Sequence, residues 1–129
     1  MSACTRGLAL LLALLAVACG PGSEAGRTIT ASELSERIDA GTAPVILDVR
    51  SPAEFAAGHI PGAMNVPHDE VAARITSLGI APDQELVVHC QSGKRAAMAE
   101  EALGGLGFTN LRDLEGHWQG WQGAGLPSE

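Results

Sequence analysis

The sequence predicts an α/β fold in which helices cover both faces of a central parallel sheet, a three-layer α/β/α arrangement. Short apolar runs at residues 44–49 and 85–89 alternate with segments that carry helix signals. The connections between them are brief, and 129 residues suffice for about one domain. In such sheets ligands bind beyond the carboxyl ends of the strands, so a site is expected at that edge.

The first predicted helix begins at a capping box, residues 30–33, in which a threonine precedes a glutamate by three positions. Leu34 and Ile38 give this helix one apolar stripe, and Gly41 ends it. The mostly apolar run at 44–49 is too short for a helix and indicates a buried parallel strand.

A second capping box, residues 51–54, has a proline at the first helical position, and Gly58 ends the short helix that it starts. Glu54 is interpreted as part of this cap. A brief strand is expected at 63–66, followed by a helix at 69–77.

The next central strand is predicted at 85–89 and a long helix at 95–106. A last short strand is expected at 110–113, and Trp118 and Trp121 lie in a final helical turn. This order places the residue after the strand at 85–89 on the ligand-binding edge of the sheet.

An unbroken apolar run, residues 8–18, follows the basic residue Arg6. It is shorter than the ~20 apolar residues of a spanning helix, and its placement is typical of a secretory signal. We therefore interpret residues 1–18 as a signal peptide, 19–26 as a flexible tether and 27–127 as the folded domain.

The end of this signal, Ala16-Val17-Ala18-Cys19, resembles the lipobox of bacterial lipoproteins, although that motif prefers leucine where this chain has Ala16. The resemblance implies that Cys19 is lipidated and tethers the protein to a membrane, facing the periplasm or the cell exterior. The alternative is a plain signal cut after Ala18, which would leave a soluble periplasmic protein.

Cysteine usage and charge narrow the function. Cys4 leaves with the signal and Cys19 takes the lipid, so Cys90 is the one free thiol of an exported domain. The net charge of −7 and the lack of a basic patch argue against nucleic-acid binding. The four histidines and Cys90 lack the spacing of a zinc site. Nothing in the sequence indicates more than a monomer.

The segment Cys90-Gln91-Ser92-Gly93-Lys94-Arg95 joins the central strand to the long helix. In a short loop before a helix, the backbone N–H groups converge and the helix N-terminus attracts anions. Gly93 permits the tight backbone, and Lys94 and Arg95 add cations. Each of these features favours the thiolate form of Cys90, which is the nucleophile.

Neighbouring side chains are expected to support this loop without taking part in chemistry. Successive residues of a strand point to opposite faces, so His89 is not expected to be a general base for Cys90. Asp48 and Arg50 are expected to brace the loop by ion pairing.

Three separated motifs resemble the rhodanese-like sulfurtransferases. Cys90-x-x-Gly93-x-Arg95 is similar to the active-site loop of that family, and residues 47–67 are similar to its first signature. Residues 114–127 resemble its C-terminal signature, with His117 where the family often has a second glycine. The resemblance covers about residues 27–127 and implies the rhodanese-like form of the α/β/α fold.

The resemblance also implies a reaction. Cys90 would attack the outer sulfur of an anionic donor such as thiosulfate and become a persulfide, and a thiol or cyanide would accept that sulfur. It implies no metal and no organic cofactor. The residues implied to bind the donor through the loop are Gln91, Ser92, Gly93, Lys94 and Arg95.

Two alternatives remain open at this point. One is a non-enzymatic module that carries sulfane sulfur or docks a redox partner, still through Cys90. The other is a phosphatase or arsenate reductase of the related fold. The loop of such phosphatases has five residues between cysteine and arginine, whereas four separate Cys90 from Arg95 here.

Overall fold

The computed structural model describes residues 27–129. The predicted signal peptide, tether and lipidated Cys19 lie outside the described residues. Within 27–129, no helix is long and apolar enough to cross a bilayer. The elements are β1 (Thr28–Ile29), α1 (Ala31–Asp39), β2 (Val45–Asp48), α2 (Pro52–Ala57), β3 (Met64–Asn65), α3 (Val71–Arg74), the 3₁₀ helix η2 (Ile75–Leu78), β4 (Leu86–His89), α4 (Lys94–Gly105), β5 (Leu111–Leu114) and α5 (His117–Gly123).

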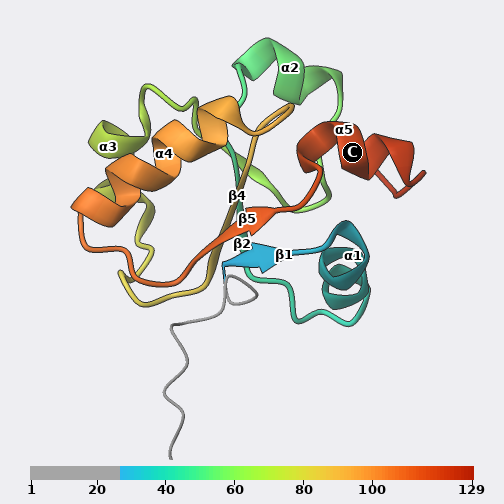
Figure 1. Ribbon diagram of the computed structural model, residues 1–129, viewed down its shortest axis with the longest axis horizontal. Coiled ribbons are helices and arrows are strands. Elements are labelled where there is room, and N and C mark those ends of the chain that lie inside the picture. Colours follow the sequence, from blue (N-terminus) through green and yellow to red (C-terminus); the bar gives the residue numbers. More distant parts are fainter. Residues whose placement is uncertain (1–26) are drawn as a thin grey trace, which may run out of the picture.

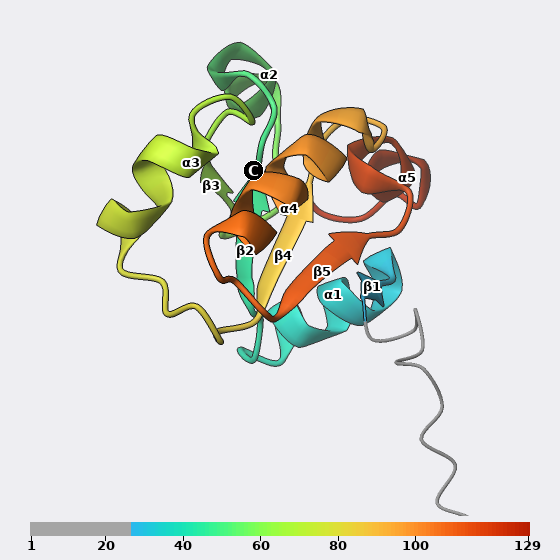
Figure 2. The same cartoon turned by 60° about the vertical axis from the view of Figure 1, so that its left-hand side comes forward.

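The strands form one sheet in the order β1-β5-β4-β2-β3, and every neighbouring pair is parallel. Helices α3 and α4 cover one face, and α1 and α5 cover the other (Figure 1). Turned by 60°, the molecule shows β4 at the centre of the sheet, leading upward into the loop before α4 (Figure 2). The predicted three-layer α/β/α fold is therefore confirmed.

Each face of the sheet has its own apolar core, because alternate strand residues point to opposite sides. The cluster beneath α3 and α4 includes Leu47, Leu86, Val88, Cys90, Ala99 and Leu103. The cluster beneath α1 and α5 includes Ile29, Leu34, Ile46, Val87, Trp118 and Trp121. Only two aromatic residues, both tryptophans of α5, belong to the second cluster, so aliphatic side chains build most of the core.

Two details of the secondary structure differ from the prediction. The helix expected at 69–77 is only one turn of α-helix, α3, which tightens into η2, and Gly79 ends it in a left-handed conformation. Such 3₁₀ turns are frequent at helix ends. Strand β1 was not predicted, because two residues are too few to show the alternation of side chains that marks a strand. It forms through its parallel pairing with β5.

The two predicted caps form to different degrees. The Ser51 hydroxyl accepts the N–H of Glu54, and the Glu54 carboxylate accepts the N–H of Ser51, so this capping box is complete. The Thr30 hydroxyl accepts the N–H of Glu33. The Glu33 carboxylate instead lies 3.7 Å from the guanidinium of Arg112.

A buried ion pair joins the end of β2 to the loop behind it. The Arg50 guanidinium donates to both carboxylate oxygens of Asp48, and its Nη2 atom lies 2.7 Å from Oδ2. Nη2 also donates to the carbonyl of Gly58, and the guanidinium lies 4.6 Å from the ring centroid of Trp118. The pair thus links β2 to the end of α2 and to α5, and it reaches the loop after β4 through Trp118, whose N–H donates to the Cys90 carbonyl.

We predict that Asp48→Ala destabilises the domain by about 3–5 kcal/mol, because it leaves the buried Arg50 charge without a counter-ion. Urea denaturation followed by tryptophan fluorescence measures this change. The double variant Asp48→Leu/Arg50→Met removes both charges and should recover most of the loss. Equal stability of Asp48→Ala and the wild type would show that the pair does not hold these elements together.

Candidate active site

Cys90 stands directly after β4, at the carboxyl edge of the sheet where the sequence placed a site. Its side chain is only 1% exposed and belongs to the apolar cluster beneath α4. The backbone N–H of Gly93 donates to its Sγ atom at 3.0 Å. This hydrogen bond aims a backbone donor directly at the Cys90 sulfur.

Gly93 is required for two reasons. Its φ angle of 121° lies in the region that favours glycine, and it is the N-cap of α4. A Cβ atom at this position would lie 2.9 Å from Nε2 of His117, closer than real Cβ contacts. The turn that aims an amide at the Cys90 sulfur therefore depends on glycine.

The two predicted cations of the loop have different surroundings. Lys94 is exposed to solvent. The Arg95 guanidinium is held by Glu54 of α2 in a two-pronged pair, with distances of 2.7 and 3.0 Å. The hydrogen bond from Arg95, together with those from Ser51, lowers the pKa of Glu54 to about 2 despite partial burial. Glu54 is thus both the cap of α2 and the partner of Arg95, and the sequence analysis gave it only the first role.

The first turn of α5 docks onto the start of the loop through three hydrogen bonds. The Cys90 N–H donates to Nδ1 of His117 at 3.3 Å. The N–H groups of Trp118 and Gln119 donate to the carbonyls of Cys90 and Gln91, at 3.0 and 3.2 Å. In the sequence, His117 stood out only as a departure from the C-terminal motif, and its contact with Cys90 was not predicted.

His89 lies on the other face of the sheet from Cys90, as predicted. It pairs in register with Asp48, and Nε2 lies 3.7 Å from that carboxylate. Burial lowers the pKa of His89, in spite of the nearby Asp48 charge, so the ring is neutral near pH 7. Nδ1 lies 3.2 Å from the Cys90 carbonyl, which places the proton on Nδ1. The ring supports the backbone of Cys90 and faces away from its sulfur.

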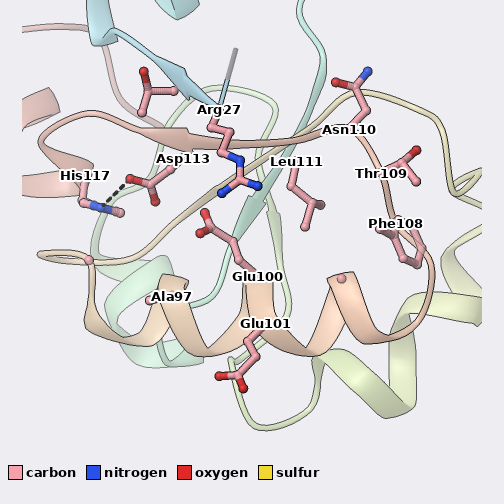
Figure 3. A pocket seen from close by; sticks show the side chains of 13 residues that line it. Arg27, Ala97, Glu100, Glu101, Phe108, Thr109, Asn110, Leu111, Asp113 and His117 are labelled. Carbon is pink, nitrogen blue, oxygen red and sulfur yellow. Dashed lines mark ion pairs between the residues drawn. The ribbon is translucent and has the colours of Figure 1, made fainter. Parts of the chain in front are cut away.

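A groove of about 860 Å³ runs between α4 and β5 and ends at the back of the loop formed by residues 90–95 (Figure 3). Its lining includes Gly93, Glu100, Asp113 and His117, but not Cys90. The groove therefore borders the loop without opening onto the thiol. Among residues 27–129, no group of three or more histidine, cysteine or acidic side chains is placed to hold a metal ion.

Two carboxyl groups in this groove, Glu100 and Asp113, have pKa values shifted in opposite directions. Burial raises the pKa of Glu100 to about 8, and the hydrogen bond and charge of Asp113 act in the same direction. Burial opposes ionisation of Asp113 as well, but hydrogen bonds from His117 and Glu100 prevail and lower its pKa. Near neutral pH the proton stays on Glu100, and Asp113 is the anion that faces His117.

We predict that this proton makes stability depend on pH. Folded Glu100 keeps its proton up to about pH 8, whereas the unfolded chain releases it near 4.5, so its contribution is full below 4.5 and is lost as pH rises through 8. Glu100→Gln cannot titrate and should show a smaller fall in unfolding free energy between pH 5 and pH 9. Urea titrations at several pH values measure this fall.

The adjacent variant Glu101→Gln is the matched control, because Glu101 is exposed on the same helix. It should follow the wild-type curve. If the unfolding free energy of Glu100→Gln fell with pH as steeply as that of the wild type, Glu100 would not hold a buried proton.

The chain is similar to known proteins over nearly all of its described length. The model of the rhodanese-like domain matches residues 30–124. The chain is 36% identical to the thiosulfate sulfurtransferase 16 of Arabidopsis thaliana, over 64% of this chain and 78% of that protein. It is 34% identical to the human thiosulfate:glutathione sulfurtransferase, over 73% of this chain and 91% of that protein. The crystal structure of a rhodanese-related protein from Thermoplasma volcanium superimposes with a TM-score of 0.68 at 36% identity, covering 80% of this chain and 97% of that one. The chain therefore belongs to the rhodanese-like family of sulfurtransferases.

Proposed function

We propose that this protein transfers sulfane sulfur from an anionic donor such as thiosulfate to a thiophilic acceptor through a persulfide on Cys90. The observation that carries the proposal is the Gly93 amide aimed at the Cys90 sulfur from the turn that starts α4. A thiol in this position gains stabilisation as an anion and lies at the floor of a loop that can receive a second sulfur atom.

In the first step, the Cys90 thiolate attacks the outer sulfur of thiosulfate. The bond between the two sulfur atoms of the donor breaks, and sulfite leaves with the electron pair. The terminal sulfur of the resulting persulfide carries the negative charge, and the amides of Gln91, Ser92, Gly93, Lys94 and Arg95 would surround it.

In the second step, the acceptor attacks that terminal sulfur. A thiolate acceptor becomes a persulfide and cyanide becomes thiocyanate, and in both cases the Cys90 thiolate is the leaving group. The two half-reactions give ping-pong kinetics, which is typical of covalent catalysis. No electrons are gained or lost overall, so the cycle needs no external oxidant.

The Glu54–Arg95 pair would hold the far end of the loop. Arg95 lies in the first turn of α4, and the two-pronged contact with α2 fixes its guanidinium and limits the movement of that turn. Because Glu54 neutralises the charge of Arg95, the anionic donor would be attracted mainly by the positive charge of Lys94 and by the loop amides.

We predict that the soluble domain, residues 27–129, gains the mass of one sulfur atom when it is incubated with thiosulfate, and that Cys90→Ser does not. Serine is a poor nucleophile near neutral pH and forms no persulfide. Intact-mass spectrometry measures the gain, and the thiosulfate–cyanide assay measures turnover. Circular dichroism of Cys90→Ser controls for folding.

Other outcomes would favour the alternatives. A mass gain that cyanide or thiols remove only very slowly would indicate a sulfur carrier. Hydrolysis of an aryl phosphate faster than turnover of thiosulfate would indicate a phosphatase. We expect negligible hydrolysis, because a ring with four residues between Cys90 and Arg95 holds a single sulfur atom more easily than a tetrahedral phosphate. Near wild-type sulfur transfer by Cys90→Ser would refute the mechanism.

We also propose that Cys19 is lipidated and tethers the domain to a membrane, so that the domain faces the periplasm or the cell exterior. The apolar run at residues 8–18 and the Ala16-Val17-Ala18-Cys19 sequence support this proposal. Expression of the full chain with labelled palmitate should give a labelled membrane protein, and Cys19→Ala should lose the label. Equal labelling would refute lipidation at Cys19, and a wild-type protein that is unlabelled and soluble would favour a plain signal cut after Ala18.

A further inference from the structure

His117 occupies a backbone conformation that its residue type rarely adopts. Its φ angle is 51°, and among residues 27–129 it is the one non-glycine residue with a positive φ. A positive φ costs a non-glycine residue free energy that its contacts must offset, although histidine tolerates it better than most residues. The side chain is buried, yet no chemical step proposed above uses it. A strained and buried polar residue beside the catalytic loop calls for an explanation in terms of its contacts.

We propose that His117 is a positioning residue for sulfur transfer, which holds the backbone of Cys90 from behind so that the loop amides face the reacting sulfur. This inference rests on the proposed function. Three contacts carry it: one to the Cys90 amide, one to Gly93 and one to Asp113.

The first contact fixes which nitrogen of the ring carries the proton. Nδ1 lies 3.3 Å from the backbone nitrogen of Cys90 and accepts its N–H, so Nδ1 must be unprotonated. The proton of the neutral ring is then on Nε2, which lies 3.5 Å from the carboxylate of Asp113 (Figure 3). An anionic Asp113 favours this tautomer, and the proton that Glu100 retains leaves Asp113 as the anion.

The second contact reaches the other end of the loop. The space that a Cβ of Gly93 would need is filled by the His117 ring, 2.9 Å away at Nε2. One ring therefore touches both Cys90, where the loop begins, and Gly93, whose amide is aimed at the sulfur. The ring thus supports both ends of the turn from behind.

Removal of the ring would disturb the nucleophile directly. The Cys90 N–H is buried and would lose its acceptor, and a buried donor without a partner is costly. The peptide would rotate toward another acceptor, and Gly93 would gain room to move. A displacement of about 1 Å between reacting groups can lower a rate about a hundredfold.

Three substitutions separate this role from a purely structural one. His117→Gly removes the acceptor but also relieves the positive φ, which offsets part of that cost, so the unfolding free energy should fall less than in His117→Ala while kcat/KM for thiosulfate falls about tenfold or more. His117→Ala should lose activity equally and also lose stability, because alanine is strained at this φ. His117→Asn tolerates this φ and places an amide oxygen near Nδ1, so it should restore most of the activity that Gly and Ala lose.

Wild-type kcat/KM in His117→Gly would overturn the proposal. So would an asparagine variant no more active than the alanine variant, or losses of activity that follow losses of stability across the three variants.

A second readout does not depend on sulfur transfer. The ¹⁵N spectrum of the His117 ring should show a protonated Nε2 and an unprotonated Nδ1, and the Cys90 amide should exchange with solvent at least tenfold faster in His117→Gly than in the wild type. The opposite tautomer, or an unchanged exchange rate, would overturn the proposal. A wild-type domain that shows these signatures but forms no persulfide would instead refute the proposed function alone.

Discussion

The backbone of Cys90 leaves the sheet while it is still buried, and its polar groups must find partners outside the ladder of strands. Buried N–H and C=O groups are almost always paired. Here the N–H donates to Nδ1 of His117, and the C=O accepts hydrogen bonds from the N–H of Trp118 and from the ring of His89. The position of Cys90, the proposed nucleophile, therefore depends on α5, a helix that begins 27 residues later in the chain.

A buried ion pair packs against the same helix. The Asp48–Arg50 pair is buried on this face, and the Arg50 guanidinium packs against the ring of Trp118. The neighbouring amide of Trp118 holds Cys90. An ion pair at the end of β2 is thus connected through Trp118 of α5 to the backbone of Cys90.

Local sequence rules recovered most of the fold. The strands at β2 and β4 followed from their short apolar runs, the Ser51–Glu54 cap from its spacing, and the opposite faces of His89 and Cys90 from the alternation of a strand. Strand β1 was missed because its two residues are a strand only through their pairing with β5. The division of the helix at 69–77 into α3 and η2 was missed because no local signal distinguishes the two types of turn.

In the candidate site too, contacts between residues close in sequence were predictable and contacts between distant residues were not. Cys90 and Gly93 lie three residues apart, so a single turn explains how the amide of one reaches the sulfur of the other. The partner of Arg95 is Glu54, 41 residues away, and spacing cannot show such a contact. The capping box already explained why a glutamate stands at position 54, so its pairing with Arg95 was not predicted.

His117 shows most clearly what a local rule misses. Considered alone, a histidine at a positive φ looks unfavourable, because the side chain adds strain that glycine would avoid. In the fold, the same side chain supplies an acceptor to the buried amide of the nucleophile and fills the space that Gly93 leaves open. Local conflicts of this kind are expected at functional sites, where tertiary contacts compensate for them. The unfavourable φ of His117 is compensated by a specific contact, the hydrogen bond that its ring accepts from the backbone of Cys90.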